Sequence, residues 1–218
     1  MFMTTRVSTL ASLSAFVLVT SVGCAACTSS NSDADAALGT GDAPRIDARG
    51  AVGDGPRPDV PAGVGEPAEL VGITLLHNEA RAAVLTATPL PSMEWDPALA
   101  ATAAAWVAQC QNTDGVPQLI DHNPGRSTGH PWYVGENIYA SGGTAIAADA
   151  VGLWMSEAGN YNYTANTCTG TCGHYTQIVW RDSVKLGCAV GNCPSIPYPS
   201  SIVCDYGPGG NIGNQRPY

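Results

Sequence analysis

The chain has 218 residues and a formal net charge of −9, with Lys185 as its only lysine. A nucleic-acid-binding surface needs clustered lysine and arginine, so this composition excludes one. Residues 66–218 are long enough for one hydrophobic core, whereas the preceding segment has too few large apolar side chains to fold. We therefore expect a single folded domain.

The first residues have the pattern of an export signal. Arg6 precedes an apolar run at residues 10–19, and small residues follow that run. This order predicts a secretory signal peptide, which we assign to residues 1–27. The residues before Cys24 are similar to a bacterial lipoprotein signal, so acylation of Cys24 is an alternative to ordinary cleavage near residue 25. We expect a bacterial protein that is secreted or lipid-anchored at the cell envelope.

Residues 28–65 consist mainly of Ala, Gly, Asp and Pro. Such a segment cannot bury enough apolar surface to offset the entropy lost on ordering. The composition predicts a disordered linker between the signal peptide and the domain.

The domain is predicted to begin with a helix between Glu66 and Thr86, because apolar residues recur there at helical spacing and Pro67 lies in the first turn. His77 lies on the apolar face of this predicted helix. A histidine in such a position is more often a hydrogen-bonded core residue than a ligand, and both interpretations stay open here.

Two further helices are predicted from their starts. Asp96 and Pro97 are typical of an N-cap and a first turn, and the helix that they begin runs to Cys110. The next helix has Thr144 as its expected N-cap and carries Glu157 at the end of its apolar stripe. A carboxylate on an apolar face loses hydration, so we expect an imidazole or a metal beside Glu157 unless that helix end is open to water.

Between these helices, residues 111–135 read as a loop that contains His122 and His130. Loop histidines are usually solvated, and spacing alone does not separate these two from ordinary surface residues. Glu136 follows directly after Gly135 and is ambiguous by itself.

The sequence pattern of the last third of the domain predicts strands. Residues 175–180 are β-branched and aromatic, so His174 would lie where a strand begins. Returning strands are expected at 185–190 and 201–206, and the tail from 211 to 218 is expected on the surface. Sequential strands with short connections pair in antiparallel fashion, and three amphipathic helices must cover them, which gives an α+β layered domain.

Six of the eight cysteines follow residue 100. An even number suits disulfide bonds in an oxidising compartment. The alternative is a metal site, but thiolate sites usually show paired knuckles with two residues between the cysteines, and the closest pairs here are wider. The six residues are Cys110, Cys168, Cys172, Cys188, Cys193 and Cys204.

Segments 173–180, 186–189 and 203–211 together resemble the two signatures of the CAP superfamily, also called the SCP domain. This superfamily comprises the cysteine-rich secretory proteins, the antigen 5 proteins and the plant pathogenesis-related group-one proteins. The resemblance runs from about residue 70 to residue 218. It also includes His77-Asn78, Gly135-Glu136-Asn137, Trp154 with Glu157, and Arg216-Pro217-Tyr218.

The resemblance implies a three-layer α-β-α sandwich with a central antiparallel sheet over residues 66–218, and an open cleft lined by two histidines and two glutamates. By the family motifs, three of these four residues correspond to Glu136, Glu157 and His174. The remaining histidine corresponds better to His122 than to His130, because of the residues that follow His122. The cysteine pattern resembles the plant members. It implies the pairs Cys110–Cys193, Cys168–Cys172 and Cys188–Cys204.

Three functions are compatible with such a cleft. The first is a binding module in which His122 and His174 hold a divalent metal, by chemistry zinc, with the two glutamates close by. The second is a hydrolase that uses Glu136 or Glu157 as general base and metal-bound water as nucleophile. The sequence has no His-Glu-x-x-His helix and no Gly-x-Ser-x-Gly turn, and the resemblance implies a family in which catalysis is generally not established.

The third function is sterol or lipid binding, which the resemblance implies through an aromatic loop before the histidine segment. Tyr161 and Tyr163 supply two aromatic residues there, but Cys168 replaces a later one. We expect a monomer whose partner is a small ligand, a lipid or a protein, with a membrane reached only through a lipid anchor.

Overall fold

The computed structural model describes residues 65–113 and 118–218. The predicted signal peptide at 1–27, with Cys24, and the predicted linker up to residue 64 lie outside the described residues. Within those two described ranges, no helix combines the length and the apolar character needed to cross a membrane.

A four-stranded sheet forms the middle of the domain. Its strands are β1 (Glu94–Trp95), β5 (Lys185–Asn192), β6 (Ser200–Gly207) and β2 (Gly135–Ser141), in the order β1-β5-β6-β2. Strands β5, β6 and β2 pair in antiparallel fashion, as expected, whereas β1 runs parallel to β5. The central sheet is antiparallel between β5, β6 and β2, as predicted, and β1 makes it mixed at one edge, because the chain leaves β1 through a helix that crosses the sheet.

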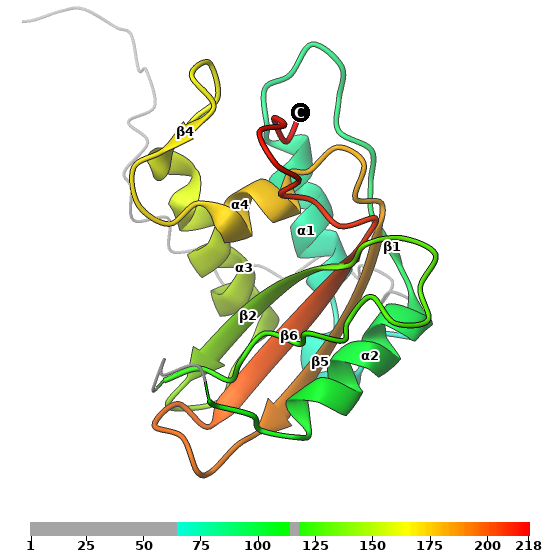
Figure 1. Ribbon diagram of the computed structural model, residues 1–218, viewed down its shortest axis with the longest axis vertical. Helices are drawn as coiled ribbons and strands as arrows, with labels where there is room; N and C mark the ends of the chain where they lie inside the picture. The colour runs from blue at the N-terminus through cyan, green and yellow to red at the C-terminus, as the bar shows by residue number, and fades with distance from the viewer. Residues whose placement is uncertain (1–64, 114–117) are drawn as a thin grey trace, which may run out of the picture. The chain divides into compact units, whose positions relative to one another are not determined.

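Helices cover both faces of the sheet (Figure 1). One face carries α1 (Ile73–Ala82), α3 (Ala147–Ser156) and α4 (Gly173–Ile178), and the other carries α2 (Pro97–Val107). The domain is an α+β three-layer sandwich, as predicted.

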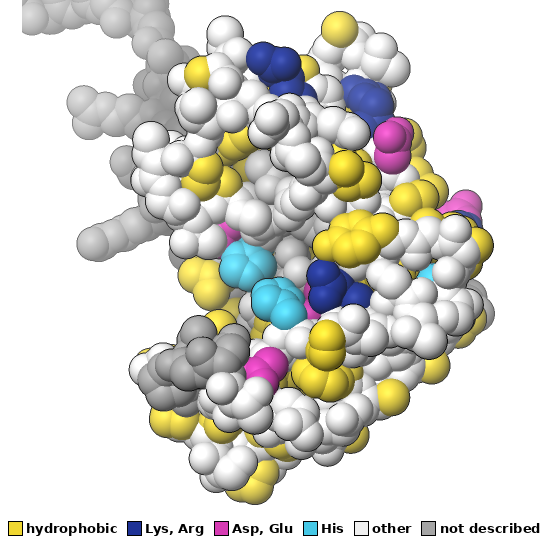
Figure 2. All heavy atoms as spheres, viewed as in Figure 1, with side chains coloured by type: hydrophobic (Ala, Val, Ile, Leu, Met, Phe, Trp, Pro, Cys, Tyr) yellow, Lys and Arg dark blue, Asp and Glu magenta, His cyan; other side chains and the backbone are white. Residues whose placement is uncertain are grey.

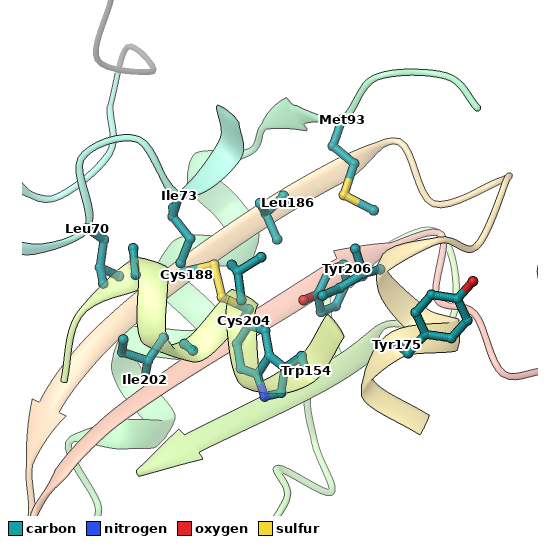
Figure 3. Packing of buried hydrophobic residues seen from close by; sticks show 14 of the residues in the cluster. Leu70, Ile73, Met93, Trp154, Tyr175, Leu186, Cys188, Ile202, Cys204 and Tyr206 are labelled. Carbon is teal, nitrogen blue, oxygen red and sulfur yellow. A yellow bond between two sulfur atoms is a disulfide. The ribbon is translucent and has the colours of Figure 1, made fainter. Parts of the chain in front are cut away.

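Alternation along the strands divides the core in two. On β5, Leu186 and Cys188 point to the face of α1 and α3, whereas Ala189 points to α2. Figure 3 shows the larger cluster, in which Trp154 of α3 lies beside Tyr206 and the disulfide between Cys188 and Cys204.

Three disulfide bonds tie the described elements together, and they join the cysteines that the family resemblance paired. The pairs are Cys110–Cys193, Cys168–Cys172 and Cys188–Cys204. Bonds of this kind typically contribute about 2 to 4 kcal/mol each, mainly through the unfolded chain. The bridge Cys168–Cys172 closes the segment between the short hairpin β3 (Tyr161–Asn162) and β4 (Thr167–Cys168) and helix α4.

The helix starts agree with the sequence in one case out of three. Asp96 caps α2 as predicted and accepts hydrogen bonds from the N–H groups of residues 98 and 99. The first predicted helix is broken at Gly72, whose φ of 88° is left-handed, so a short 3-10 turn (Ala68–Leu70) precedes α1. Thr144 is not the N-cap of α3, because the Ala145 N–H is still bonded to the Ser200 hydroxyl of the sheet.

The strand predicted at 175–180 is also wrong. Residues 173–178 form helix α4, since distant side chains satisfy the N–H and C=O groups at both its ends. The tail after residue 210 has no helix or strand, and most of it is exposed as predicted, although Pro217 is buried.

Candidate functional site

His174 and Glu157 form the first of two acid–imidazole pairs. Glu157 follows the end of α3, and its Oε1 lies 2.6 Å from His174 Nδ1. The other carboxylate oxygen accepts the backbone N–H groups of His174 (2.9 Å) and Tyr175 (3.2 Å). Glu157 thus fixes the ring and also satisfies the first N–H groups of α4. The imidazole, as expected, is the partner of this carboxylate.

The far end of α4 is held by Arg81 of α1, which is 1% exposed. Its guanidinium donates to the carbonyl groups of Ile178 and Trp180, both at 2.7 Å. Burial, and then the charge of Arg181, lower the pKa of Arg81 to about 10, so it stays charged at neutral pH. Arg81 therefore fixes the short helix that carries His174.

His122 and Glu136 form the second pair. Glu136 lies on β2, and its Oε1 accepts from His122 Nδ1 at 2.6 Å and from the Asn123 N–H at 2.9 Å. The side chain of Glu136 is fully buried, whereas that of His122 is 57% exposed. The acid is a fixed support beneath an accessible ring.

The two pairs meet at the edge strand β2. Asn137, the residue after Glu136, donates its side-chain N–H to the backbone carbonyl of His174 (3.1 Å) and to the Tyr206 hydroxyl (3.1 Å). Adjacent residues of a strand point to opposite faces, so the pairs approach the edge from the two sides of the sheet. Figure 2 shows histidine side chains gathered on one exposed face of the molecule.

The other two histidines have structural roles. His77 is buried, with Nδ1 2.8 Å from the Ile73 carbonyl oxygen and Nε2 2.9 Å from the Tyr206 hydroxyl. Burial lowers the pKa of His77 to about 4, so it is a neutral core residue. His130 Nε2 lies 3.0 Å from the Thr102 hydroxyl of α2, and Glu136 bonds His122 instead.

The hydrogen bonds determine which ring nitrogen is free. In both pairs the Nδ1–H donates to a carboxylate, which leaves the Nε2 lone pair available. Neither Nε2 makes a hydrogen bond within the part of the chain that the structure describes. The indole of Trp154 stacks on the ring of His174, with 6.1 Å between centroids.

A second carboxyl group lies against Glu136 and was not recognised as a site residue from the sequence. Asp205 of β6 is the register partner of Glu136 and is fully buried. Burial, and then the charge of Glu136, raise the pKa of Asp205 to about 8, against an opposing effect of Arg126. The signal was present in the sequence, because a carboxylate in the apolar run 201–206 calls for a partner just as Glu157 does.

Two cavities of the described domain are lined by neither the histidines nor the glutamates of these pairs. A cavity of about 610 Å³ is lined by residues 85–88 together with Tyr163, Arg181 and Tyr218. A smaller one of about 360 Å³ is lined mainly by the ends of α1 and α3, Tyr175 and Tyr218. The histidine rings lie on an open surface, which is accessible to small ligands without any opening movement.

Comparison with known proteins assigns the family. The family model described as CAP, cysteine-rich secretory protein family, matches residues 75–206. The chain belongs to this family. Pathogenesis-related protein 1 of Arabidopsis thaliana is 44% identical over 142 residues, which are 65% of this chain and 78% of the plant protein.

Solved structures agree on the fold of this family member. The venom allergen-like protein 4 of Schistosoma mansoni superposes with a TM-score of 0.54 and 26% identity, over 67% of this chain and 91% of that one. The crystal structure of NaASP2 with Zn²⁺ gives a TM-score of 0.50 and 25% identity, over 71% and 90%.

Curated relatives of this family member come from plants and mammals. They give no support to a bacterial source. The family is one of secretory proteins, which agrees with the expected export of the chain.

Proposed function

We propose that this CAP protein is a secreted binding module in which His122 and His174 hold a divalent metal, zinc. The observation that carries the proposal is the shared geometry of the two pairs, a 2.6 Å contact between Nδ1 and a carboxylate. Histidines that bind a metal usually donate their other ring N–H in this way, which fixes the tautomer and raises the basicity of the ligand nitrogen.

Two histidine ligands fit a metal site with free coordination positions, and not one in which the protein supplies every ligand. Within residues 65–113 and 118–218, no group of three or more His, Cys, Asp or Glu side chains could hold a metal ion. Two imidazoles would therefore supply two ligands, and water or a bound ligand would complete the coordination. A bound metal would supply a Lewis-acidic position for an anionic or polar ligand.

The structural relative NaASP2, crystallised with Zn²⁺, supports the choice of zinc. The type of ligand atom also favours zinc over calcium or magnesium, because imidazole nitrogen suits zinc, copper and nickel, whereas calcium and magnesium prefer oxygen ligands.

Calorimetric titration of the full chain with a zinc salt tests this proposal. We expect wild-type protein to bind zinc and the double variant His122→Ala, His174→Ala to lose at least about 100-fold in affinity. The matched control is His130→Ala, which removes a histidine bonded only to Thr102 and should leave the affinity unchanged. Because protons compete for imidazole nitrogen and histidines generally titrate near about pH 6.5, binding should weaken in acid.

Equal zinc binding by the wild type and the double variant would refute the assignment of both histidines. Loss of binding in His130→Ala alone would place the metal at His130 instead.

The hydrolase alternative gains less from the geometry. A general base must reach the substrate or a water, yet Glu157 already accepts three hydrogen bonds and the side chain of Glu136 is fully buried. Both acids are thus better suited to holding the histidines than to moving a proton of a substrate.

Lipid binding is the second candidate, because one observation favours it. The cavity of about 360 Å³ is lined largely by apolar side chains from the end of α1 and the residues after it, from Met155 and Ala158, and by Tyr175 and Tyr218. An acyl chain would fit such a lining. Extraction of purified protein with organic solvent, followed by mass spectrometry, would detect a bound lipid, and Ala83→Trp should exclude it.

We also propose export, with Cys24 as a site of lipid attachment. The support is the apolar segment at 10–19 followed by small residues and a cysteine. Mass spectrometry of the mature N-terminus would show either an acylated Cys24 or a free N-terminus beyond it.

A further inference from the structure

Two carboxyl groups face each other in the sheet beneath the His122 ring. Glu136 of β2 and Asp205 of β6 are register partners in an antiparallel pair, so their side chains leave the sheet on the same face. Both side chains are fully buried. Three of their four oxygens, Glu136 Oε2 and both oxygens of Asp205, have no hydrogen-bond donor among the described residues.

The elements packed around Asp205 bring little positive charge to it. From β5 its neighbour is Gly187, against which the first turn of α2 packs so closely that a Cβ would lie 2.1 Å from Ala100 N. The carboxylate at the start of α2, Asp96, is occupied by N–H groups of its own helix.

The loop before β2 carries Arg126, whose charge acts against the raised pKa of Asp205. Its guanidinium donates hydrogen bonds to the carbonyl oxygens of Val134 (2.8 Å) and Asn123 (2.7 Å) and to the Tyr133 hydroxyl (3.0 Å). The indole of Trp132 packs on Gly207, two residues beyond Asp205 on the same face, and covers that end of the strand.

A proton, and not a metal, is the species that fits between the two acids. In the described part of the chain no third His, Cys, Asp or Glu joins them to complete a metal site. Two ionised carboxylates in a dry site repel each other, and the usual outcome is that one of them keeps its proton.

The hydrogen bonds decide which acid is ionised. Glu136 Oε1 receives two donors, the Asn123 N–H and the His122 Nδ1–H, and donors of this kind stabilise a charged carboxylate. Asp205 receives none. The neutral member of the pair is therefore Asp205, in agreement with its raised pKa of about 8.

We propose that Asp205 is a positioning residue for the candidate metal site: its carboxyl O–H donates to Glu136 Oε2, so that Glu136 Oε1 stays directed at His122. The effect on the ring tautomer depends only on the geometry of the pair. The consequence for zinc affinity rests on the proposed function.

Nitrogen-15 NMR of metal-free full chain at pH 7 tests the positioning role. In wild type we expect His122 in a single tautomer with the proton on Nδ1, and a carbon-13 shift of a protonated carboxyl for Asp205. Asp205→Asn keeps a donor for Oε2 and should preserve the tautomer. Asp205→Val suits the apolar strand but has no donor, and should give a mixture of tautomers.

Asp182→Asn, at an exposed aspartate, is the matched control and should change nothing. An ionised Asp205 at pH 7, or an unchanged tautomer in Asp205→Val, would overturn the proposal. If Asp205→Val does not fold, the carboxyl signal in wild type and the tautomer in Asp205→Asn still decide it.

Zinc titration separates this inference from the proposed function. We expect Asp205→Val to lose about tenfold in affinity, at the lower end of the range for supporting partners, and Asp205→Asn to retain it. If wild type binds no zinc, the proposed function fails, while the NMR measurements still decide the role of Asp205.

Discussion

The two acid–imidazole pairs have the same contact and different supports. In each, a carboxylate oxygen lies 2.6 Å from a histidine Nδ1. Glu157 also accepts two backbone N–H groups at the start of α4 and is 13% exposed. Glu136 accepts one backbone N–H, is fully buried and faces a second acid.

This difference shows two ways of keeping a carboxylate charged beside a histidine. The start of a helix supplies Glu157 with N–H donors, and solvent supplies the remainder. A strand has its N–H groups engaged in the sheet, so Glu136 depends on loop donors and, by our inference, on the proton of Asp205. Loss of the Asp205 proton should therefore disturb the contact between Glu136 and His122. The contact between Glu157 and His174 does not depend on such a proton.

The largest expected effect is on the pH dependence of folding stability at Asp205. Its pKa is raised from the model-compound value of 3.8 to about 8 in the folded state, because it is buried and faces Glu136. The folded protein thus holds this proton more tightly than the unfolded chain, and stability falls as pH rises from about 4 to about 8. Asp205→Asn has no carboxyl group to titrate, so the variant should not lose stability over this pH range.

Urea unfolding at several pH values measures this effect. We expect Asp205→Asn to match wild type near pH 4 and to exceed its unfolding free energy by about 3 kcal/mol at pH 9, less than the full shift would give because the site relaxes. Asp182→Asn, at an exposed position, should follow the wild-type curve throughout. Parallel curves for Asp205→Asn and wild type would contradict a proton held by the pair.

The second prediction compares the two acids directly. Glu157→Ala leaves the His174 and Tyr175 N–H groups without an acceptor, and should lower the unfolding free energy by about 2 kcal/mol at pH 7. Glu136→Ala loses its bonds too, but it also relieves the burial of a charge beside Asp205, so we expect a loss below about 1 kcal/mol.

Urea unfolding with Glu79→Ala, an exposed glutamate of α1, provides the control, for which a change within about 0.5 kcal/mol is expected. Equal losses for Glu157→Ala and Glu136→Ala would mean that the two supports do not differ.

Sequence patterns predicted the layers of this fold because they depend on local signals. Asp96 with Pro97 marks the start of α2, and strands β5 and β6 extend the predicted ranges by one or two residues. Spacing and cap residues suffice for such elements. The acids of the two acid–imidazole pairs, Glu136 and Glu157, were predicted from family motifs. Of the two, only Glu157 was also expected to have a partner from its position on an apolar stripe.

Helix α4 shows what local signals miss. Residues 175–180 are all buried, so no face of the segment reveals a period, and the β-branched and aromatic content favours a strand. The contacts that make it helical come from Glu157, 17 residues away, and from Arg81, 97 residues away from Ile178. Asp205 was missed for a related reason, since its partner at 136 is brought close only by strand pairing.

The smallest expected effect concerns Asn137, which links the two pairs. Its side-chain N–H groups donate to the His174 carbonyl and to Tyr206, so Asn137→Ala should cost about 1 kcal/mol in urea unfolding. Zinc affinity should fall by less than the about tenfold typical of removing a group that holds a ligand directly, because both Nδ1 contacts remain. Asn160→Ala, which removes an exposed hydrogen bond to Thr171, should alter neither quantity. A tenfold or larger loss of affinity in Asn137→Ala, with both histidine tautomers intact, would mean that the spacing of the two rings, and not the hydrogen bond within each pair, determines metal binding.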